Sequence, residues 1–281
     1  PVQTGQVIPG KEPVMIRKGF IAAAAVLWLT PFVIMVLIAL NQTNTTSFSA
    51  LLDPSSMGFG NFVNAWQEGQ FSTGFFNTLI VTVVSVAGIL LLSAMAGYAL
   101  SRFSFRSKQL LTALMAMTVL IPTVFFTIPV YQILRMVHAD TSLAGLILAE
   151  VGGGHVIFIL MFRQFFDNLP NELTESARMD GCSELQMFWK IFFPISRPIV
   201  AAVVITQSIW TWNSFLFPLI LSLNNPAIRT LSVGMYSFQG ENIVNWGAMA
   251  AAGCITVLPV VILFVCFQKY FINGMEGAVK G

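Results

Sequence analysis

Two ionisable side chains lie within an apolar stretch of this sequence, where acid–base chemistry or metal binding would first be sought. Glu150 and His155 flank a run that contains three consecutive glycines. An ionisable residue in such a segment is a functional candidate, and this pair could bind a solute, relay protons or ligate a metal. The spacing is not that of a zinc-binding HExxH helix, and no second histidine is near. We favour a structural role for both groups and expect no catalysis and no metal site.

A second candidate is a group of polar and aromatic residues within the apolar sequence TQSIWTWNSFLFPL. Amides pair with sugar hydroxyls, and the C–H face of a sugar ring stacks on an aromatic ring, so the group could line the path of a carbohydrate. Polar residues in membrane helices also bond adjacent helices, and the sequence leaves both interpretations open. The candidate path residues are Gln207, Trp210, Trp212, Asn213 and Ser214.

The N-terminal sequence GQVIPGKE has the GxxxxGK skeleton of a phosphate-binding loop. Glu12 stands where a Ser or Thr would hold magnesium, and Pro9 interrupts the run of backbone donors. No strand precedes the segment. We interpret it as a polar tail and expect no cofactor in this chain, so active transport would need ATP and magnesium bound by another subunit.

The composition indicates a membrane environment for the elements that carry these residues. The chain of 281 residues is 56% hydrophobic and 9% charged, and its mean hydropathy is +0.78. Soluble domains have about 25% charged residues. Several apolar runs exceed the roughly 18 residues that mark a transmembrane helix. We therefore predict an all-α integral membrane protein with six transmembrane helices. Their approximate ranges are 20–40, 77–100, 109–134, 142–166, 198–221 and 246–271.

Lysine and arginine are distributed unequally between the two sides of these spans. Only Arg135 and Arg229 lie in the three loops of one side, and the other twelve basic residues lie at or beside the ends and loops of the opposite side. The positive-inside rule therefore places both termini and the 167–197 segment in the cytoplasm.

The 167–197 segment is the most polar part of the chain, with eight of its 26 charged residues. Glu172 and Glu175 suit the positive end of a short helix that begins near Pro170. Gly181 can take a positive φ and end that helix. The sequence SELQ, which starts at Ser183, indicates a capping box for a second short helix.

The same segment, ESARMDG…IFFP, resembles the signature loop of ABC-importer permeases: Glu-Ala-Ala, three residues, Gly, nine residues, Ile and, three positions on, Pro. The sequences WNSFLFPLI and FINGMEGAVKG are similar to those of the carbohydrate branch, the maltose-type second permease, although Ser214 stands where that branch usually has Asp. The resemblance implies contact with an ATPase through this loop. The residues assigned to it are Glu172, Glu175, Ser176, Ala177, Asp180, Gly181, Ile191 and Pro194.

The resemblance further implies a type I ABC-importer permease fold in the inner (plasma) membrane. The chain would comprise a cytoplasmic tail, residues 1–18, and a transmembrane permease domain, residues 19–281. Its expected partners are a second homologous permease, a cytoplasmic ATPase dimer, an extracytoplasmic solute-binding protein and membrane lipid, with no nucleic acid.

The implied function is the import of a sugar, an oligosaccharide or a sugar-like polyol phosphate by alternating access, and not an enzymatic reaction. The alternative is an ion-coupled secondary transporter or a channel subunit. Such transporters typically show internal repeats and more intramembrane charge, and we find neither in this sequence.

Overall fold

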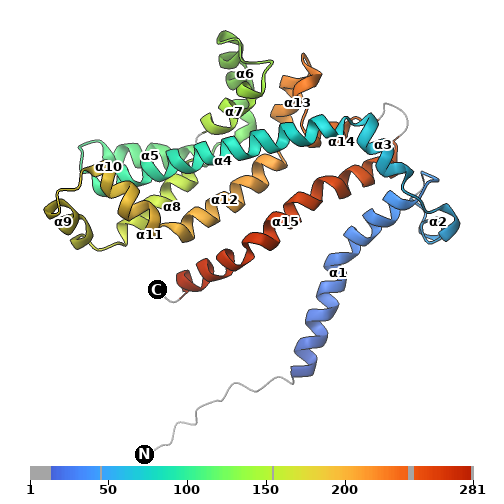
Figure 1. Cartoon of the computed structure of the whole chain (residues 1–281), viewed down its shortest axis with the longest axis horizontal. Coiled ribbons are helices and arrows are strands. Elements are labelled where there is room, and N and C mark those ends of the chain that lie inside the picture. Colours follow the sequence, from blue (N-terminus) through green and yellow to red (C-terminus); the bar gives the residue numbers. More distant parts are fainter. Residues whose placement is uncertain (1–13, 45, 154, 240–243, 280–281) are drawn as a thin grey trace, which may run out of the picture.

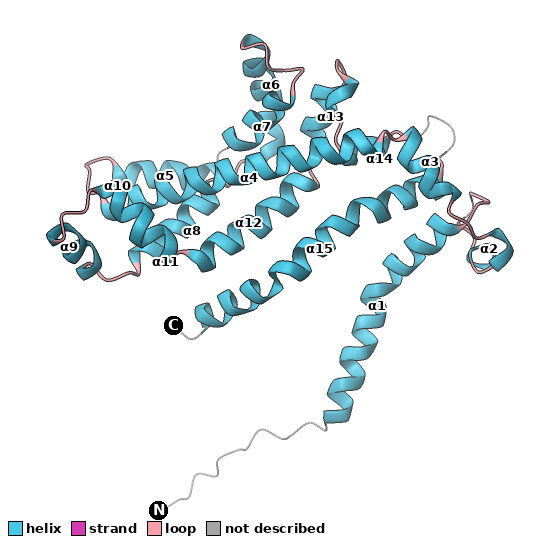
Figure 2. Ribbon diagram, in the orientation of Figure 1, coloured by secondary structure: helices cyan, strands magenta, loops and turns pink. Residues whose placement is uncertain are grey.

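The computed structural model describes residues 14–44, 46–153, 155–239 and 244–279, which form helices joined by short connections (Figures 1 and 2). No β-strand occurs in these ranges. The GxxxxGK sequence and most of the predicted tail, residues 1–18, lie outside the described residues, and a helix already begins at Val14. The chain is therefore an all-α protein, as the sequence predicts.

Three helices of the described chain are long and apolar enough to cross a bilayer unbroken, and three bent helix pairs bring the number of candidate spans to six. The helices are α1 (Val14–Leu40), α2 (Phe48–Leu51), η1 (Pro54–Ser56), α3 (Gly60–Glu68), α4 (Phe71–Arg102), α5 (Lys108–Thr118), η2 (Thr123–Phe126), α6 (Thr127–Met136), α7 (Leu143–Gly152), α8 (Val156–Asp167), α9 (Glu172–Met179), α10 (Glu184–Met187), η3 (Phe188–Phe192), α11 (Phe193–Ile195), α12 (Arg197–Trp212), α13 (Leu216–Ser222), η4 (Pro226–Ile228), α14 (Leu231–Tyr236) and α15 (Trp246–Val279).

The third and fourth predicted spans are bent, not straight. The chain turns by 100° between α5 and the following η2–α6 unit, and by 50° between α7 and α8. Pro122 lies in the first break, where it cannot donate a backbone hydrogen bond and disfavours helical geometry in the residue before it. Glycines precede the second break, and glycine favours non-helical backbone.

The fifth predicted span, 198–221, is wrong as a single helix, because α12 ends at Trp212 and α13 begins at Leu216. Asn213 lies at this end, where its backbone N–H (3.1 Å) and its side-chain Nδ2 (2.8 Å) both donate to the Ile209 carbonyl. A side chain that bonds a local carbonyl in this way competes with helix continuation.

Helix α4 lies at the centre of the bundle and packs against α7, α8, α12 and α14 (Figure 1). Its contact with α8 is very close: a Cβ atom built on Gly97 would lie 2.5 Å from Phe162 Cβ and 2.9 Å from the Ile159 carbonyl oxygen. Only glycine leaves room for this approach of the two backbones.

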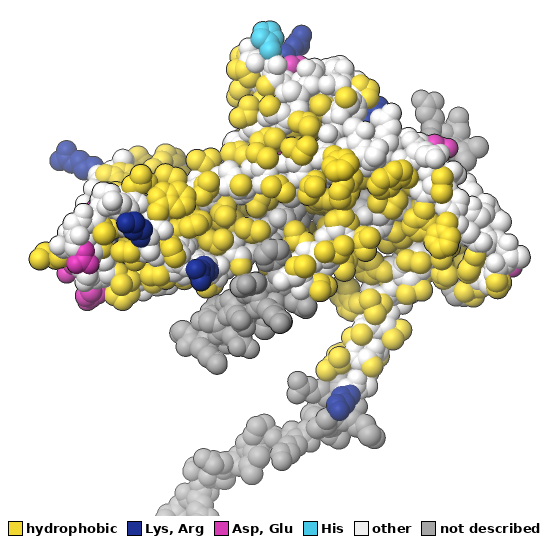
Figure 3. Space-filling model, in the orientation of Figure 1, with side chains coloured by type: hydrophobic (Ala, Val, Ile, Leu, Met, Phe, Trp, Pro, Cys, Tyr) yellow, Lys and Arg dark blue, Asp and Glu magenta, His cyan; other side chains and the backbone are white. Residues whose placement is uncertain are grey.

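Apolar side chains cover much of the face of the bundle seen in Figure 3. Exposed residues such as Leu120 (83% exposed) and Trp28 (77%) would be unfavourable in water. Charged side chains gather at the ends of the visible face. This distribution suits a molecule surrounded by lipid across its middle.

We expect Gly97→Ala to destabilise the protein by about 1–3 kcal/mol, the usual cost of overpacking, because its methyl group would meet the α8 backbone. A lower unfolding temperature of the purified protein in detergent would show the effect. Gly19→Ala is the matched control, since a Cβ at Gly19 has no atom within 4 Å. Equal unfolding temperatures for Gly97→Ala and the wild type would contradict the close contact.

Candidate functional site

The 167–197 segment contains the short helix α9, whose two faces differ in exposure. Thr174 and Ala177 are buried, whereas Met179 is 88% exposed. Glu172 and Glu175 are exposed in its first turn, where a negative charge suits the helix dipole. The exposed residues of the predicted ATPase-contacting set are Glu172, Glu175, Ser176, Asp180 and Gly181.

The C-terminal end of α9 is formed by the predicted glycine. Gly181 has a φ of +77°, and its N–H donates to the Arg178 carbonyl (3.0 Å). The Cys182 N–H donates to the Ala177 carbonyl (3.0 Å), so the two bonds form a Schellman motif. The predicted start was wrong: α9 begins at Glu172, so Pro170 precedes its first turn.

The predicted capping box starts the next helix, α10. The Ser183 side chain accepts from the Gln186 N–H (3.3 Å), and the Ser183 N–H donates to Gln186 Oε1 (2.9 Å). Two backbone donors are thereby satisfied at the start of α10. The turn between α9 and α10 is thus fixed by local hydrogen bonds at both sides.

Glu184 joins this turn to the end of α4. Its Oε1 accepts from Arg178 Nη2 (2.8 Å), and its Oε2 accepts from the Tyr98 hydroxyl (3.1 Å). The hydrogen bond to Glu184 raises the pKa of the Arg178 guanidinium above its ordinary value. The Arg178–Glu184 pair is exposed to solvent, which screens its charges, so it contributes little to stability. Its main effect is to orient the carboxylate toward Tyr98.

Arg102, the last residue of α4, binds the connection between α8 and α9. Its Nη2 donates to the carbonyls of Phe166 (2.6 Å) and Leu169 (3.2 Å), and its Nη1 donates to Asn171 Oδ1 (2.9 Å). The guanidinium also lies 4.7 Å from the centre of the Phe192 ring. One cation thus satisfies carbonyls at the C-terminal end of α8, which favours positive charge.

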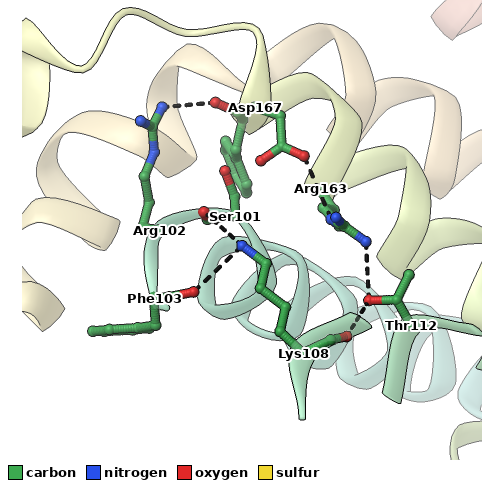
Figure 4. A network of polar contacts seen from close by, with 8 residues as sticks. Ser101, Arg102, Phe103, Lys108, Thr112, Arg163 and Asp167 are labelled. Atoms are coloured by element: carbon green, nitrogen blue, oxygen red, sulfur yellow. Dashed lines mark hydrogen bonds and ion pairs between the residues drawn. The ribbon is translucent and has the colours of Figure 1, made fainter. Parts of the chain in front are cut away.

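A second arginine links α8 to α5 (Figure 4). Arg163 Nη1 donates to Thr112 Oγ1 (2.9 Å), and its Nε lies 3.4 Å from Asp167 Oδ2. Beside it, Lys108 Nζ donates to the Phe103 carbonyl (3.3 Å) just after α4 ends. From the sequence, these cations indicate only the orientation of the chain in the membrane. Their positions beside predicted helix ends are the signal that could have revealed their hydrogen bonds.

The remaining predicted residues, Ile191 and Pro194, lie in the helical stretch after α10. Pro194 has no N–H, and the preceding turn is a π-helix in which the Phe193 N–H donates to the Phe188 carbonyl. Ile191 is half-buried against the aromatic core. The Tyr98 ring lies in that core, with its centre 5.1–6.0 Å from the ring centres of Phe166, Phe188 and Phe192. The part of the 167–197 segment that follows α9 therefore packs against α4 and α8.

A separate cavity of about 550 Å³ lies between η2, α6, α7, α12 and α13; its lining is mostly apolar, and we call it the polar cavity after the polar side chains that it contains. Glu150 and His155 line it, together with three of the predicted path residues: Gln207, Trp210 and Ser214. The other two are placed elsewhere among the described residues. Trp212 Nε1 donates to the Thr256 carbonyl (3.1 Å) in α15, and Asn213 caps α12.

A chain of hydrogen bonds crosses the wall of the polar cavity. Gln207 Nε2 donates to Thr211 Oγ1 (2.9 Å), and Thr211 Oγ1 donates to Glu150 Oε2 (3.3 Å). His155 Nε2 lies 2.6 Å from the Glu150 carbonyl oxygen. The sequence predicts a structural role in which Glu150 and His155 bond neighbouring helices; Glu150 does so through Thr211, whereas the bond of His155 is to the nearby Glu150 carbonyl. Ionisable groups in an apolar segment were the available signal.

The comparisons with known proteins agree with this architecture. Residues 89–277 match the family model described as binding-protein-dependent transport system inner membrane component. The chain is 33% identical to the arabinooligosaccharides transport system permease protein AraQ of Bacillus subtilis, with 82% of each chain covered. It is 32% identical to the melibiose/raffinose/stachyose import permease protein MelC of the same organism, covering 89% of this chain and 91% of MelC.

A solved structure shares the fold. It is the crystal structure of a bacterial ABC transporter involved in the import of the acidic polysaccharide alginate, and one of its chains superposes with a TM-score of 0.80 at 21% identity. The match covers 94% of this chain and all of the other chain. The chain belongs to the binding-protein-dependent transport system inner membrane components, the membrane-spanning permeases of ABC importers.

Proposed function

We propose that this permease carries a carbohydrate across the membrane and receives its driving force through the 167–197 segment. The observation that carries the coupling proposal is the exposed, polar face of α9 on a segment otherwise packed into the bundle. The carbohydrate class is supported by relatives named for arabinooligosaccharides and for melibiose, raffinose and stachyose. An ion-coupled transporter or channel subunit is the less supported alternative.

In this proposal α9 docks on a cytoplasmic ATPase. Ser176 is small and allows close approach, while Glu172, Glu175 and Asp180 offer charges for pairing with basic groups. Ala177 and Ile191 belong to the same hydrophobic core, and Pro194 lies in the helical turn after Ile191. A displacement of α9 is then passed to α4 and α8 through Glu184 and Arg102.

The remaining subunits are inferred from this division of labour. An ATPase dimer would bind ATP and magnesium, and this chain would be non-catalytic. A solute-binding protein would deliver the carbohydrate, and a second homologous permease would complete the path. Gln207, Trp210 and Ser214 are the favoured path residues, whereas Trp212 and Asn213 stabilise α12 in the described state.

Gly181→Val should uncouple ATP hydrolysis from uptake in the reconstituted complex. The space around Gly181 is open, so the defect comes from a φ of +77°, which costs a β-branched residue about 1–3 kcal/mol. Gly181→Asn is the matched control, because asparagine tolerates this conformation. The measurement is solute imported per ATP hydrolysed. Normal coupling in Gly181→Val would refute the role of α9.

Arg102→Ala should weaken coupling as well, because it leaves the Phe166 and Leu169 carbonyls without their donor. A hydrogen bond to a charged group contributes about 1.5–3 kcal/mol to stability, so a lower unfolding temperature should accompany the defect. Arg106→Ala is the control, since Arg106 is an exposed cation in the next loop. If both variants have the same coupling and the same stability, the hydrogen bonds of Arg102 play no part in coupling, and its charge serves only to orient the chain in the membrane.

The proposed orientation, with both termini and α9 in the cytoplasm, is testable by cysteine labelling in a cysteine-free background. Met179→Cys and Met136→Cys introduce thiols at residues that are 88% and 79% exposed. In right-side-out membrane vesicles, an impermeant maleimide should label position 136 and spare position 179. Labelling of position 179 and not of position 136 would show the opposite orientation of the chain in the membrane.

A further inference from the structure

The polar cavity contains a buried acceptor without a donor. The Gln207 side chain is 1% exposed, and its Nε2 is bonded to Thr211. Its Oε1 has no hydrogen-bond partner in the described part of the chain. Buried polar atoms are rarely left in this state, and an amide oxygen can be satisfied only by an O–H or N–H group. A hydroxyl group of a solute bound in the cavity is one donor that would satisfy this oxygen.

The charge in the same wall is negative. Glu150 Oε2 accepts from Thr211, and no basic side chain of the described residues lies within ion-pair distance of the carboxylate. The cavity is lined by no Lys or Arg in the described ranges, and the Nε2 of its one histidine, His155, is occupied by the Glu150 carbonyl. A phosphate or carboxylate in this cavity would face Glu150 without a compensating Lys or Arg.

An aromatic surface completes the cavity. Trp210 lines it and keeps 51% of its surface exposed. Its ring stacks on Phe158, with centres 5.5 Å apart, and Phe158 stacks on His155, with centres 5.9 Å apart. The stack fixes the indole beside the two acceptors. A volume of about 550 Å³ is within the range of small-molecule sites.

We propose that the polar cavity is a contact site for neutral, hydroxyl-rich solutes and excludes their anionic forms. Solute hydroxyls donate to Gln207 Oε1 and to Glu150, and the C–H face of a sugar ring lies on Trp210. This assignment rests on the proposed carbohydrate function and sharpens it. It favours neutral sugars and polyols over a polyol phosphate.

The test compares glucose with glucuronate, which differ only in a CH₂OH group replaced by a carboxylate. Binding of each probe to the assembled complex in nanodiscs is measured by saturation-transfer NMR, without the solute-binding protein. The wild type should prefer glucose at least about tenfold, a difference of about 1.4 kcal/mol. Glu150→Gln should reduce this preference at least about threefold, and Gln207→Leu should weaken glucose binding by a similar factor.

Glu68→Gln is the control, because Glu68 is an exposed carboxylate on α3 outside the cavity. Assembly and basal ATP hydrolysis are measured on every variant to identify a folding defect. If Gln207→Leu shows such a defect, Gln207→Asn is used in its place. Equal binding of the two probes to the wild type, or an unchanged preference in Glu150→Gln, would overturn the site. Those results would leave the proposed function intact if carbohydrate uptake persists, whereas a complex that imports no carbohydrate would refute that function itself.

Discussion

The close approach of α4 and α8 at Gly97 is the constraint on which the rest of the arrangement depends. It brings the last turns of α4 beside the C-terminal end of α8, so that Arg102 reaches Leu169 at the start of the 167–197 segment and Tyr98 reaches Glu184 within it. A larger residue at Gly97 would separate the helices and withdraw the guanidinium from the Phe166 carbonyl. The packing of the aromatic core around Tyr98 depends on this short separation between α4 and α8.

The second constraint is that interrupted helices within a membrane must satisfy their free backbone groups or border a cavity. Three interruptions meet at the polar cavity: η2 between α5 and α6, the α7–α8 bend, and the break after α12. Thr123, Gly153 and Ser214, one from each interruption, all line it. The cavity thus results from helix breaks that lie close together in space. Part of its polar lining comes from residues that would pack against adjacent helices if the helices were straight.

The sequence predicts the apolar helices and the turn at Gly181 well, because hydropathy and glycine or capping patterns are local signals. Pro122 and the glycines before Gly154 mark the bends in the third and fourth spans, whereas the break after Trp212 is not predicted, because an averaged hydropathy is the same for a straight and a bent helix. Nor does the sequence reveal that Thr211 links Glu150 to Gln207, since this connection joins helices distant in the chain. Arg102 was counted only as a positive charge, because its acceptors are backbone carbonyls that a sequence does not display.

The geometry also joins the two sites physically. Helix α8 runs from His155 at the polar cavity to Asp167 beside the 167–197 segment, and α12 runs from the other end of that segment back toward Trp210. At 1.5 Å per residue these helices are about 18 and 24 Å long. Because packed helices resist bending more than their connections do, a displacement of α9 that keeps the aromatic core intact must tilt α8 and α12. Their far ends carry His155, Gln207 and Trp210, so the same displacement changes the shape of the cavity that these residues line.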